Sequence, residues 1–457
     1  MQPFRYHVFV CDQQKPEGVP CCSARGSRKV IDVLRAEVAA QGLADRVQIT
    51  TCGSLGLCER GPNMVVYPDG VWYSCASASD VPELVRSHFA NATPLERLMN
   101  YDPQAVRAEI ESNKSKMQAA MRAKDAAGAL PDDLHQLIRG FQESRAVLTA
   151  IELDAFNAVG NGASAAEAAV KMGTNARATE MLLNALAALG LLAKQDGKFH
   201  NAPVSTRFFT AGSPDDSRAA TMHIAHLWHR WSTLTDCVRA GTSVARREPR
   251  EIDDQWTVPF IAAMHRNARE RAPHVVKAVG VTGVRRMLDV GGGSAAYSIA
   301  FAEANPDLHV EVLDRPEVLE IAQGHINRAG LAARVTTRIG DLRTDSLGDS
   351  LDDGYDLILV SAICHMLSPD ENRDLFRRCR QALGPRGRVV IQDFILEEDK
   401  TAPRMAALFS LNMLVGTESG ASYNEHEYAR WLGEAGFQNV ERIRLPAPSG
   451  LMVGRVG

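Results

Sequence analysis

The chain has few aromatic residues, little net charge and no long apolar run. Among its 457 residues, 6% are aromatic, and 51 Lys and Arg residues nearly balance 55 Asp and Glu residues. Such a balance gives no sign of a nucleic-acid or membrane partner. No apolar run approaches the roughly 18 residues that a membrane-spanning helix needs, and the start, Met1-Gln2-Pro3-Phe4-Arg5, lacks the features of a signal peptide. We therefore expect a cytoplasmic protein that binds neither nucleic acid nor membrane.

Cysteine is also scarce, and its distribution is uneven. Nine cysteines in 457 residues are too few for a disulfide scaffold. Five of them fall within the first 58 residues: Cys11, Cys21, Cys22, Cys52 and Cys58. Clustering of this kind in a reducing compartment indicates metal or redox chemistry. At roughly 150 residues per domain, the chain has room for about three domains.

Three domains and a linker follow from the patterns along the chain. Residues 1–92 predict a strand–helix–strand unit and then a hairpin, with elements at Tyr6–Val10, Lys29–Ala40, Val47–Thr50, Met64–Tyr67 and Val71–Tyr73. Residues 93–130 are polar and helix-prone and predict a linker with a helix. Residues 131–248 read as helical, with a capping-box sequence at Ser164–Glu167 and a short hairpin at Lys194–Phe199, which indicates a winged helix-turn-helix.

Residues 249–457 alternate strands and helices, as a parallel α/β sheet requires. Residues 285–294 form an apolar strand that runs into three glycines, and glycines such as Gly291 and Gly293 let the backbone turn tightly against a ligand. The next strand, His309–Leu313, ends at an acid that can accept hydrogen bonds from ribose hydroxyls. Ligands of open α/β sheets bind at the carboxyl ends of the strands, so six residues are expected to converge there: Asp289, Asp314, Asp341, Ser361, His365 and Asp393.

Several motifs of this region occur in a characteristic order: Leu288–Gly293, Ile363–His365 with Ser368–Glu371, Val390–Asp393, and Ser422–Phe437. Together they resemble the S-adenosylmethionine-dependent O-methyltransferases of the plant caffeate and bacterial polyketide type. The resemblance covers residues 130–457 and implies a multidomain α/β protein with a helical winged-helix dimerisation domain and a class I (Rossmann-like) methyltransferase domain. It further implies a homodimer and a small hydroxyl acceptor that is aromatic or polycyclic.

The same resemblance assigns the binding residues of S-adenosylmethionine. Gly291 and Gly293 would hold its methionine end, Asp314 its ribose, and Asp341 would lie beside its adenine, with Asp289 and Ser361 lining the same crevice. A dinucleotide fold is the alternative interpretation. It is disfavoured because the three glycines lack the G-x-G-x-x-G spacing that seats a pyrophosphate, and no phosphate-binding lysine follows.

The catalytic base of the family maps onto His365. This residue lies just beyond the fourth expected strand, Asp356–Val360, and before a capped helix, so it is predicted to project over the crevice. An imidazole can take the proton of a hydroxyl as its oxygen attacks the methyl group. Asp393 occupies the orienting position, where glutamate is more common. The plant members have a second acidic residue, and its position falls near Ser422 here, with Glu418 as the nearby acid. Catalysis by proximity alone and methylation of a different nucleophile therefore stay alternatives, as does a packing role for His365.

The winged-helix block has two interpretations. DNA binding would need a cationic recognition helix, but Thr174–Leu189 carries only Arg177 against Glu180. Dimerisation, which the resemblance implies, is therefore favoured. Three histidines at three-residue spacing, His223, His226 and His229, could suggest a metal site. With no carboxylate or cysteine nearby, we interpret them as pocket or surface residues.

The first 92 residues carry a second resemblance. Cys11 follows the first strand, Cys22 precedes Ala24–Ser27, and Leu55–Cys58 leads into Gly61-Pro62 and Val65–Pro68. These stretches resemble the thioredoxin-like [2Fe-2S] ferredoxins, which implies a thioredoxin-like fold and four ligands to a cluster. The departure is Ser54, which stands where the family has its third cysteine. The favoured ligand set is Cys11, Cys22, Cys52 and Cys58, with Cys21 and Cys75 as possible substitutes. Two alternatives stay open: Ser54 binds iron through its oxygen, or the cluster has been lost and the domain is an interaction module.

The sequence thus predicts an S-adenosylmethionine-dependent O-methyltransferase with an accessory iron–sulfur domain. Methyl transfer by displacement moves no electrons, so the cluster would serve redox gating, an electron-transfer partner, or reduction of the acceptor. Two other classes stay open, a redox-responsive winged-helix transcription regulator and a cofactor-binding protein without catalysis. The acceptor itself is not identified, because the candidate pocket residues Trp228, Met405, Phe409 and Met413 would suit an ordinary core equally well.

Overall fold

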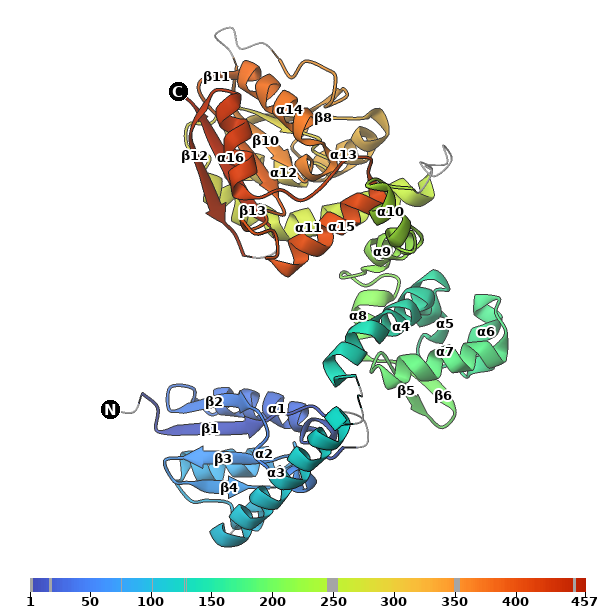
Figure 1. Cartoon of the computed structure of the whole chain (residues 1–457), viewed down its shortest axis with the longest axis vertical. Helices are drawn as coiled ribbons and strands as arrows, with labels where there is room; N and C mark the ends of the chain where they lie inside the picture. Colours follow the sequence, from blue (N-terminus) through green and yellow to red (C-terminus); the bar gives the residue numbers. More distant parts are fainter. Residues whose placement is uncertain are drawn as a thin grey trace. The chain divides into compact units, whose positions relative to one another are not determined.

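The structure, a computed structural model, describes residues 3–15, 19–74, 76–100, 102–126, 128, 130–244, 254–348, 354–446 and 449–457. Cys75 and the expected domain boundary between residues 248 and 249 lie outside these ranges. The chain divides into two compact units, Met1–Gly140 and Phe141–Gly457. Figure 1 labels the helices and strands of both.

The first unit is built on a four-stranded sheet in the order β2-β1-β3-β4. Strand β1 (Tyr6–Cys11) is parallel to β2 (Val47–Cys52) and antiparallel to β3 (Met64–Tyr67), which forms a hairpin with β4 (Val71–Tyr73). The helices are α1 (Ser27–Ala40), α2 (Val81–Leu84) and α3 (Pro103–Ala126). Val8, Ile31, Leu34 and Tyr73 are fully buried in one core. The predicted strand–helix–strand unit and its hairpin are confirmed.

The next elements are mainly helical. They are α4 (Asp132–Glu152), α5 (Ala155–Val159), α6 (Ala165–Met172), α7 (Ala176–Ala188), the hairpin of β5 (Leu192–Gln195) and β6 (Lys198–Asn201), and α8 (Pro203–Phe209). The predicted capping box is confirmed, because the Ser164 hydroxyl accepts from the Glu167 N–H and the Glu167 carboxylate accepts from the Ser164 N–H. A core that includes Phe156, Leu183 and Phe199 holds α5 to α7 against the hairpin.

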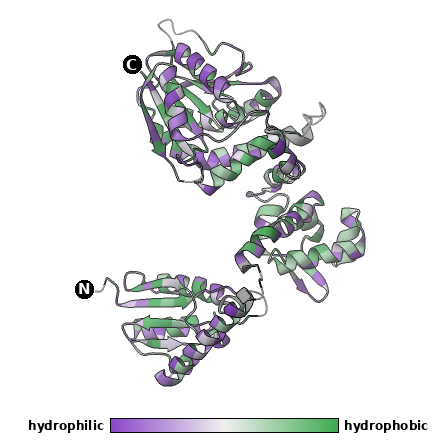
Figure 2. Ribbon diagram, viewed as in Figure 1, coloured by the Kyte–Doolittle hydropathy of each residue, from purple (hydrophilic) through white to green (hydrophobic). Residues whose placement is uncertain are grey.

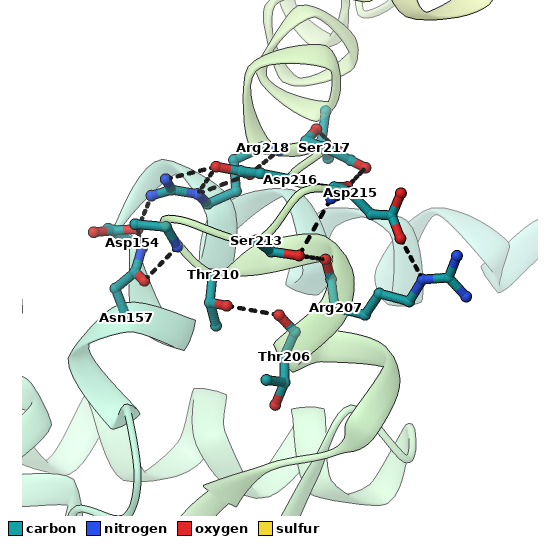
Figure 3. A network of polar contacts seen from close by, with 12 residues as sticks. Asp154, Asn157, Thr206, Arg207, Thr210, Ser213, Asp215, Asp216, Ser217 and Arg218 are labelled. Carbon is teal, nitrogen blue, oxygen red and sulfur yellow. Dashed lines mark hydrogen bonds and ion pairs between the residues drawn. The ribbon is translucent and has the colours of Figure 1, made fainter. Parts of the chain in front are cut away.

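A polar network follows α8 and joins it to α9 (Arg218–Trp231), which α10 (Leu234–Ala240) follows (Figure 3). Arg218 binds Asp154 at 3.0 Å and Asp216 at 2.9 Å, while Arg207 of α8 binds Asp215 at 2.6 Å. Arg266 of α11 (Asp254–Val279) donates to the carbonyl oxygen of Asp215 at 3.0 Å. The loop between α8 and α9 is therefore tied to α8, α9 and α11 by charge-assisted hydrogen bonds.

The remaining strands form one seven-stranded sheet in the order β12-β13-β11-β10-β7-β8-β9. The strands in chain order are β7 (Arg286–Val290), β8 (His309–Asp314), β9 (Val335–Ile339), β10 (Tyr355–Ser361), β11 (Leu383–Asp393), β12 (Phe437–Arg444) and β13 (Gly450–Val456). The five strands from β7 to β11 pair in parallel, and β13 is antiparallel to both β11 and β12. The predicted parallel sheet is confirmed, and the antiparallel pair β12 and β13 extends it beyond β11.

Helices cover both faces of this sheet. They are α12 (Ala296–Ala304), α13 (Pro316–Arg328), α14 (Pro369–Ala382), α15 (Arg404–Gly416) and α16 (Glu425–Glu434). One core joins α11, α12 and α13 to one face, and the other core joins α14 and α16 to the opposite face. Apolar residues concentrate on the central strands (Figure 2). Because both faces are covered, functional side chains gather at the carboxyl edge, where the strands end.

Within the described part of the chain, none of the helices combines the length and apolarity that crossing a bilayer requires.

Candidate active site

The glycine turn after β7 leaves open space beside the sheet edge. Gly291 has φ +67°, and a Cβ there would lie 2.4 Å from Cδ1 of Ile363. Gly293 has φ +58°, and a Cβ there would meet nothing within 4 Å. The Gly293 N–H donates to the Asp314 carboxylate at 2.9 Å, which ties the turn to the end of β8. Both glycines adopt a backbone conformation that side chains disfavour. Gly291 lets Ile363 pack closely against the turn, whereas Gly293 faces open space in which a ligand could lie.

Two acids flank this turn. Asp289 is buried, and one of its oxygens accepts from the Ser298 hydroxyl at 2.6 Å while the other has no partner. Burial raises the pKa of Asp289 to about 6. Burial also raises the pKa of Asp314, whose carboxylate accepts from the N–H groups of Gly293 and Arg315. An unpaired buried carboxylate oxygen is an acceptor position that a ligand donor would satisfy, so these residues fit a nucleoside with a charged amino acid end.

The other proposed cofactor residues lie at the ends of β9 and β10. Asp341 is exposed, and its carboxylate accepts from the Arg343 N–H at 2.8 Å. Ser361 donates to Oε1 of Gln392 at 2.6 Å, and the Tyr297 hydroxyl donates to the same oxygen at 3.3 Å. Sequence reasoning missed Gln392 and Tyr297 as members of the site. Gln392 stands next to Asp393 in the Val390–Asp393 motif, and this position is the signal that could have identified it.

His365 and Asp393 form a buried dyad. His365 lies on a 3₁₀ turn (Cys364–Met366) just after β10, and Asp393 ends β11. The His365 Nδ1 lies 2.6 Å from Asp393 Oδ1, and the His365 N–H donates to Oδ2 at 3.1 Å. The Tyr428 hydroxyl of α16 donates to Oδ2 at 3.3 Å, and the Phe394 N–H donates to Oδ1 at 2.8 Å. The shorter aspartate therefore reaches the imidazole directly.

The dyad determines which ring nitrogen can act as a base. A carboxylate next to Nδ1 favours the imidazole tautomer that is protonated at Nδ1, so Nε2 keeps a free lone pair and can accept a proton. His365 is only 6% exposed, which limits competition from water. The predicted helix cap after it is confirmed, because Ser368 and Glu371 form both bonds of a capping box at the start of α14.

Aromatic rings surround His365. The ring of Phe409 on α15 meets the imidazole edge to face at 4.8 Å, and the ring of Phe394 packs against Phe409 at 4.2 Å with its plane tilted by 33°. Arg271 of α11 lies over Phe394 at 5.8 Å. Met413 is buried on α15, whereas Met405 is 57% exposed. The environment of the imidazole is thus apolar and aromatic, with a cation at its margin.

Other candidates lie apart from the dyad. Glu418 is exposed, and Ser422 is buried with an unpartnered hydroxyl. Besides His365, the side chain of Tyr428 donates to the Asp393 carboxylate. On α9, Trp228 lies under the guanidinium of Arg145 at 5.6 Å. His223 is buried, and burial lowers its pKa to about 4. Among the described residues, no group of three His, Cys, Asp or Glu side chains could hold a metal ion.

The first unit brings Cys11 beside Cys22 and Cys58 beside Ser54. Cys11 and Cys22 are hydrogen-bonded to each other, which lowers the pKa of Cys11 to about 6 and raises that of Cys22. The Cys58 sulfur lies 3.2 Å from the Ser54 hydroxyl and accepts from Lys15 Nζ at 3.1 Å. Cys52 is half-buried opposite Cys11 in the β1–β2 register, and burial raises its pKa. Cys21 accepts from the Ala24 N–H at 3.4 Å, outside both pairs.

Comparisons with known proteins agree with the geometry of the second unit. A family model described as an O-methyltransferase domain matches residues 231–438, and one described as an O-methyltransferase dimerisation domain matches residues 135–211. No family model matches the N-terminal region.

Individual relatives match over most of their own length. The 3-hydroxy-5-methyl-1-naphthoate 3-O-methyltransferase of Streptomyces sahachiroi is 33% identical over 332 residues, which are 71% of this chain and 95% of that protein. The tetracenomycin polyketide synthesis 8-O-methyl transferase TcmO of Streptomyces glaucescens is 28% identical over 335 residues, covering 71% and 96%. A solved structure of PigF with SAH, a protein known from Serratia sp. (strain ATCC 39006), has TM-score 0.65 at 27% identity and covers 71% of this chain and 99% of its own.

Proposed function

The chain belongs to the S-adenosylmethionine-dependent O-methyltransferase family that carries a dimerisation domain, and we propose that it methylates a hydroxyl group of a small aromatic or polycyclic acceptor. The observation that carries this proposal is the buried His365–Asp393 pair, 2.6 Å apart, at the same sheet edge as the glycine turn. Relatives that act on naphthoate and tetracenomycin substrates support an acceptor of this class.

The donor position follows from the glycine turn. S-adenosylmethionine supplies an electrophilic methyl group when it is bound. The turn of Gly291 and Gly293 would hold its methionine end, with open space at Gly293. Asp314 would accept from its ribose hydroxyls, and the unpartnered oxygen of Asp289 would accept from a donor of the ligand. Asp341 is exposed at the neighbouring strand end, where an adenine would lie beside it.

The acceptor position follows from the dyad. Nε2 of His365 would take the proton of the acceptor hydroxyl, and Asp393 would stabilise the imidazolium that forms. Such a base contributes roughly 10²- to 10⁴-fold, and fixed alignment of the reactants contributes about 7–11 kcal/mol more. The rings of Phe394 and Phe409 offer flat apolar surfaces beside the imidazole, which suit an aromatic acceptor.

The direct test uses S-adenosylmethionine with a labelled methyl group and a panel of hydroxylated aromatic and polycyclic compounds. His365→Ala should lower the transfer rate by about 10²- to 10⁴-fold with donor affinity unchanged. His274→Ala, at an exposed position of α11, is the matched control and should keep the wild-type rate. Unchanged turnover in His365→Ala would remove the proposed base, and transfer only to carbon or nitrogen acceptors would contradict the proposed hydroxyl acceptor.

We also propose that the protein acts as a homodimer. Helix α4 exposes four large apolar side chains at helical spacing, Leu134, Leu137, Ile138 and Phe141, and the dimerisation model begins within this helix. Such a stripe is costly to leave in water. Light scattering should give twice the chain mass, and Leu137→Glu with Ile138→Glu should shift it toward the monomer.

For the first unit we propose a [2Fe-2S] cluster, in line with the thioredoxin-like ferredoxins that its sequence resembles. The supporting observation is that its donors come as two pairs, since each iron of such a cluster takes two protein ligands. A pairwise arrangement is compatible with the lack of any three-residue site for a single ion among the described residues. Anaerobic purification with iron and sulfide analysis tests this proposal, and comparing methyl transfer before and after reduction tests redox gating.

A further inference from the structure

The loop that carries Ser54 and Cys58 packs against the Cys11–Cys22 pair. The Leu55 and Gln13 N–H groups both donate to the Cys11 sulfur. Asn63 Nδ2 donates to the Cys22 sulfur at 3.3 Å and to the carbonyl oxygen of Leu57 at 2.7 Å. Both sulfur groups therefore border the loop from residue 54 to residue 63.

The close approach of this loop requires a glycine. A Cβ at Gly61 would lie 2.7 Å from the Cys22 sulfur and 3.0 Å from its Cα, so no larger residue fits without displacing the backbone. Asn63 is buried as well, and its side-chain oxygen accepts from Ser74 at 2.6 Å. The position of the loop against Cys22 is thus fixed by packing and by a satisfied buried amide.

Ser54, and not Cys52, is the partner of Cys58. The Ser54 hydroxyl lies 3.2 Å from the Cys58 sulfur and accepts from the Gly56 N–H at 3.2 Å. Cys52 instead ends β2, where it lies across from Cys11 in the neighbouring strand. Two donors beside one another match the two protein ligands that one iron of a dinuclear cluster takes.

Resting on the cluster proposed above, we infer that Ser54 binds the second iron through Oγ beside Cys58, that Cys11 and Cys22 bind the first iron, and that Cys52 stays outside the ligand set. When it binds, the Ser54 hydroxyl releases its proton to solvent and its Oγ forms a bond to iron. Lys15 Nζ, 3.1 Å from the Cys58 sulfur, places a positive charge next to the anionic ligands.

An oxygen ligand has consequences that a thiolate does not. Oxygen is a harder donor than sulfur and binds iron with less covalent character. Ser54→Cys should therefore keep the iron, move the charge-transfer bands of the absorption spectrum to longer wavelength, and make the cluster easier to reduce. Ser54→Ala removes the donor, and Cys52→Ala is its matched control two residues away.

The experiment compares full-length wild type with Ser54→Ala, Ser54→Cys and Cys52→Ala after anaerobic purification. Iron and sulfide content, absorption spectra, and electron paramagnetic resonance of dithionite-reduced samples are the readouts, and circular dichroism melting checks folding. The wild type should hold about two irons and two sulfides per chain, and Cys52→Ala should match it in content and spectrum. Ser54→Ala should lose at least half of the iron.

Two different failures are distinguishable. Iron loss in Cys52→Ala that equals or exceeds the loss in Ser54→Ala overturns the ligand assignment while the cluster itself stands. A wild type that holds no iron after anaerobic reconstitution with ferrous ions and sulfide, and shows a Cys11–Cys22 disulfide by mass spectrometry after air exposure, overturns the cluster proposal. Neither result bears on the methyltransferase assignment, which calorimetry with S-adenosylhomocysteine checks on the same samples.

Discussion

Replacing Asp393 by asparagine removes the charge that faces the proposed base while keeping the size of the side chain. In the structure this carboxylate accepts from the His365 ring at 2.6 Å, from the His365 N–H at 3.1 Å and from the Tyr428 hydroxyl at 3.3 Å. Asparagine can accept only part of these bonds, because its amide nitrogen is a donor. The variant should therefore stay folded but lose the stabilisation of the imidazolium that forms during methyl transfer.

The magnitude follows from the separation of the two charges. With the Nδ1–Oδ1 distance at 2.6 Å, the charge centres lie about 4 Å apart, which gives about 4 kcal/mol at an effective dielectric constant of about 20. At about 1.4 kcal/mol for each factor of ten in rate, the upper limit is about a thousandfold. Because the proton is only partly transferred in the transition state, we expect a loss of about 10²- to 10³-fold in kcat.

The assay is transfer of a labelled methyl group to an identified acceptor, with the affinity for S-adenosylhomocysteine measured by calorimetry on the same preparations. Tyr428→Phe is the matched control, since it removes one neutral donor to the same carboxylate and should cost about tenfold or less. If Asp393→Asn kept a kcat within threefold of the wild type, with unchanged affinity for S-adenosylhomocysteine, Asp393 would not stabilise the imidazolium as proposed.

Three further predictions concern stability. Asp289→Asn should raise the free energy of unfolding by about 1–3 kcal/mol near pH 8, because burial lifts the pKa of this carboxyl from 3.8 to about 6 and makes its ionisation in the native state unfavourable. Urea titrations should show that this gain in stability vanishes toward pH 4. A gain that does not depend on pH would contradict this cause. His265→Gln should lessen the loss of stability as the pH falls from 6.5 toward 4, since burial and the His325 ring stacked at 3.8 Å lower the pKa of His265 to about 4. A melting temperature that falls with pH as steeply in the variant as in the wild type would count against this prediction. Gly291→Ala should cost about 1–2 kcal/mol for its positive φ and weaken donor binding through the contact with Ile363; an unshifted melting temperature would refute the strain.

Much of the fold could be predicted because the signals were local. The hairpin at Met64–Tyr67 and Val71–Tyr73 was predicted to the residue, since apolar runs flank an obvious turn. The capping box at Ser164 depends on residues three positions apart and is therefore readable. Strand β11 begins at Leu383, well before the apolar residues 389–391, because Leu383 pairs with Tyr355 ahead of a register shift in the ladder. The local sequence does not predict this long-range pairing.

The site was only partly predictable for a different reason. His365 and Asp393 were expected to approach, because adjacent parallel strands bring their carboxyl ends together. Tyr428 was not assigned a role, since its contact with Asp393 depends on how α16 packs against the sheet. The choice between Cys52 and Ser54 stayed open in the sequence, because only the path of the loop decides which of the two side chains meets Cys58.

We propose that the glycine turn and Asp314 together bind the nucleoside of a methyl donor. Titration calorimetry of S-adenosylhomocysteine into the folded full-length chain measures this directly, with Asp314→Ala as the comparison. We expect saturable binding to the wild type and an affinity at least tenfold weaker in the variant, because a hydrogen bond to a carboxylate is worth about 1.5–3 kcal/mol. Equal affinities would contradict the assigned role of Asp314, and no measurable heat with well-folded wild type would contradict the binding site as a whole.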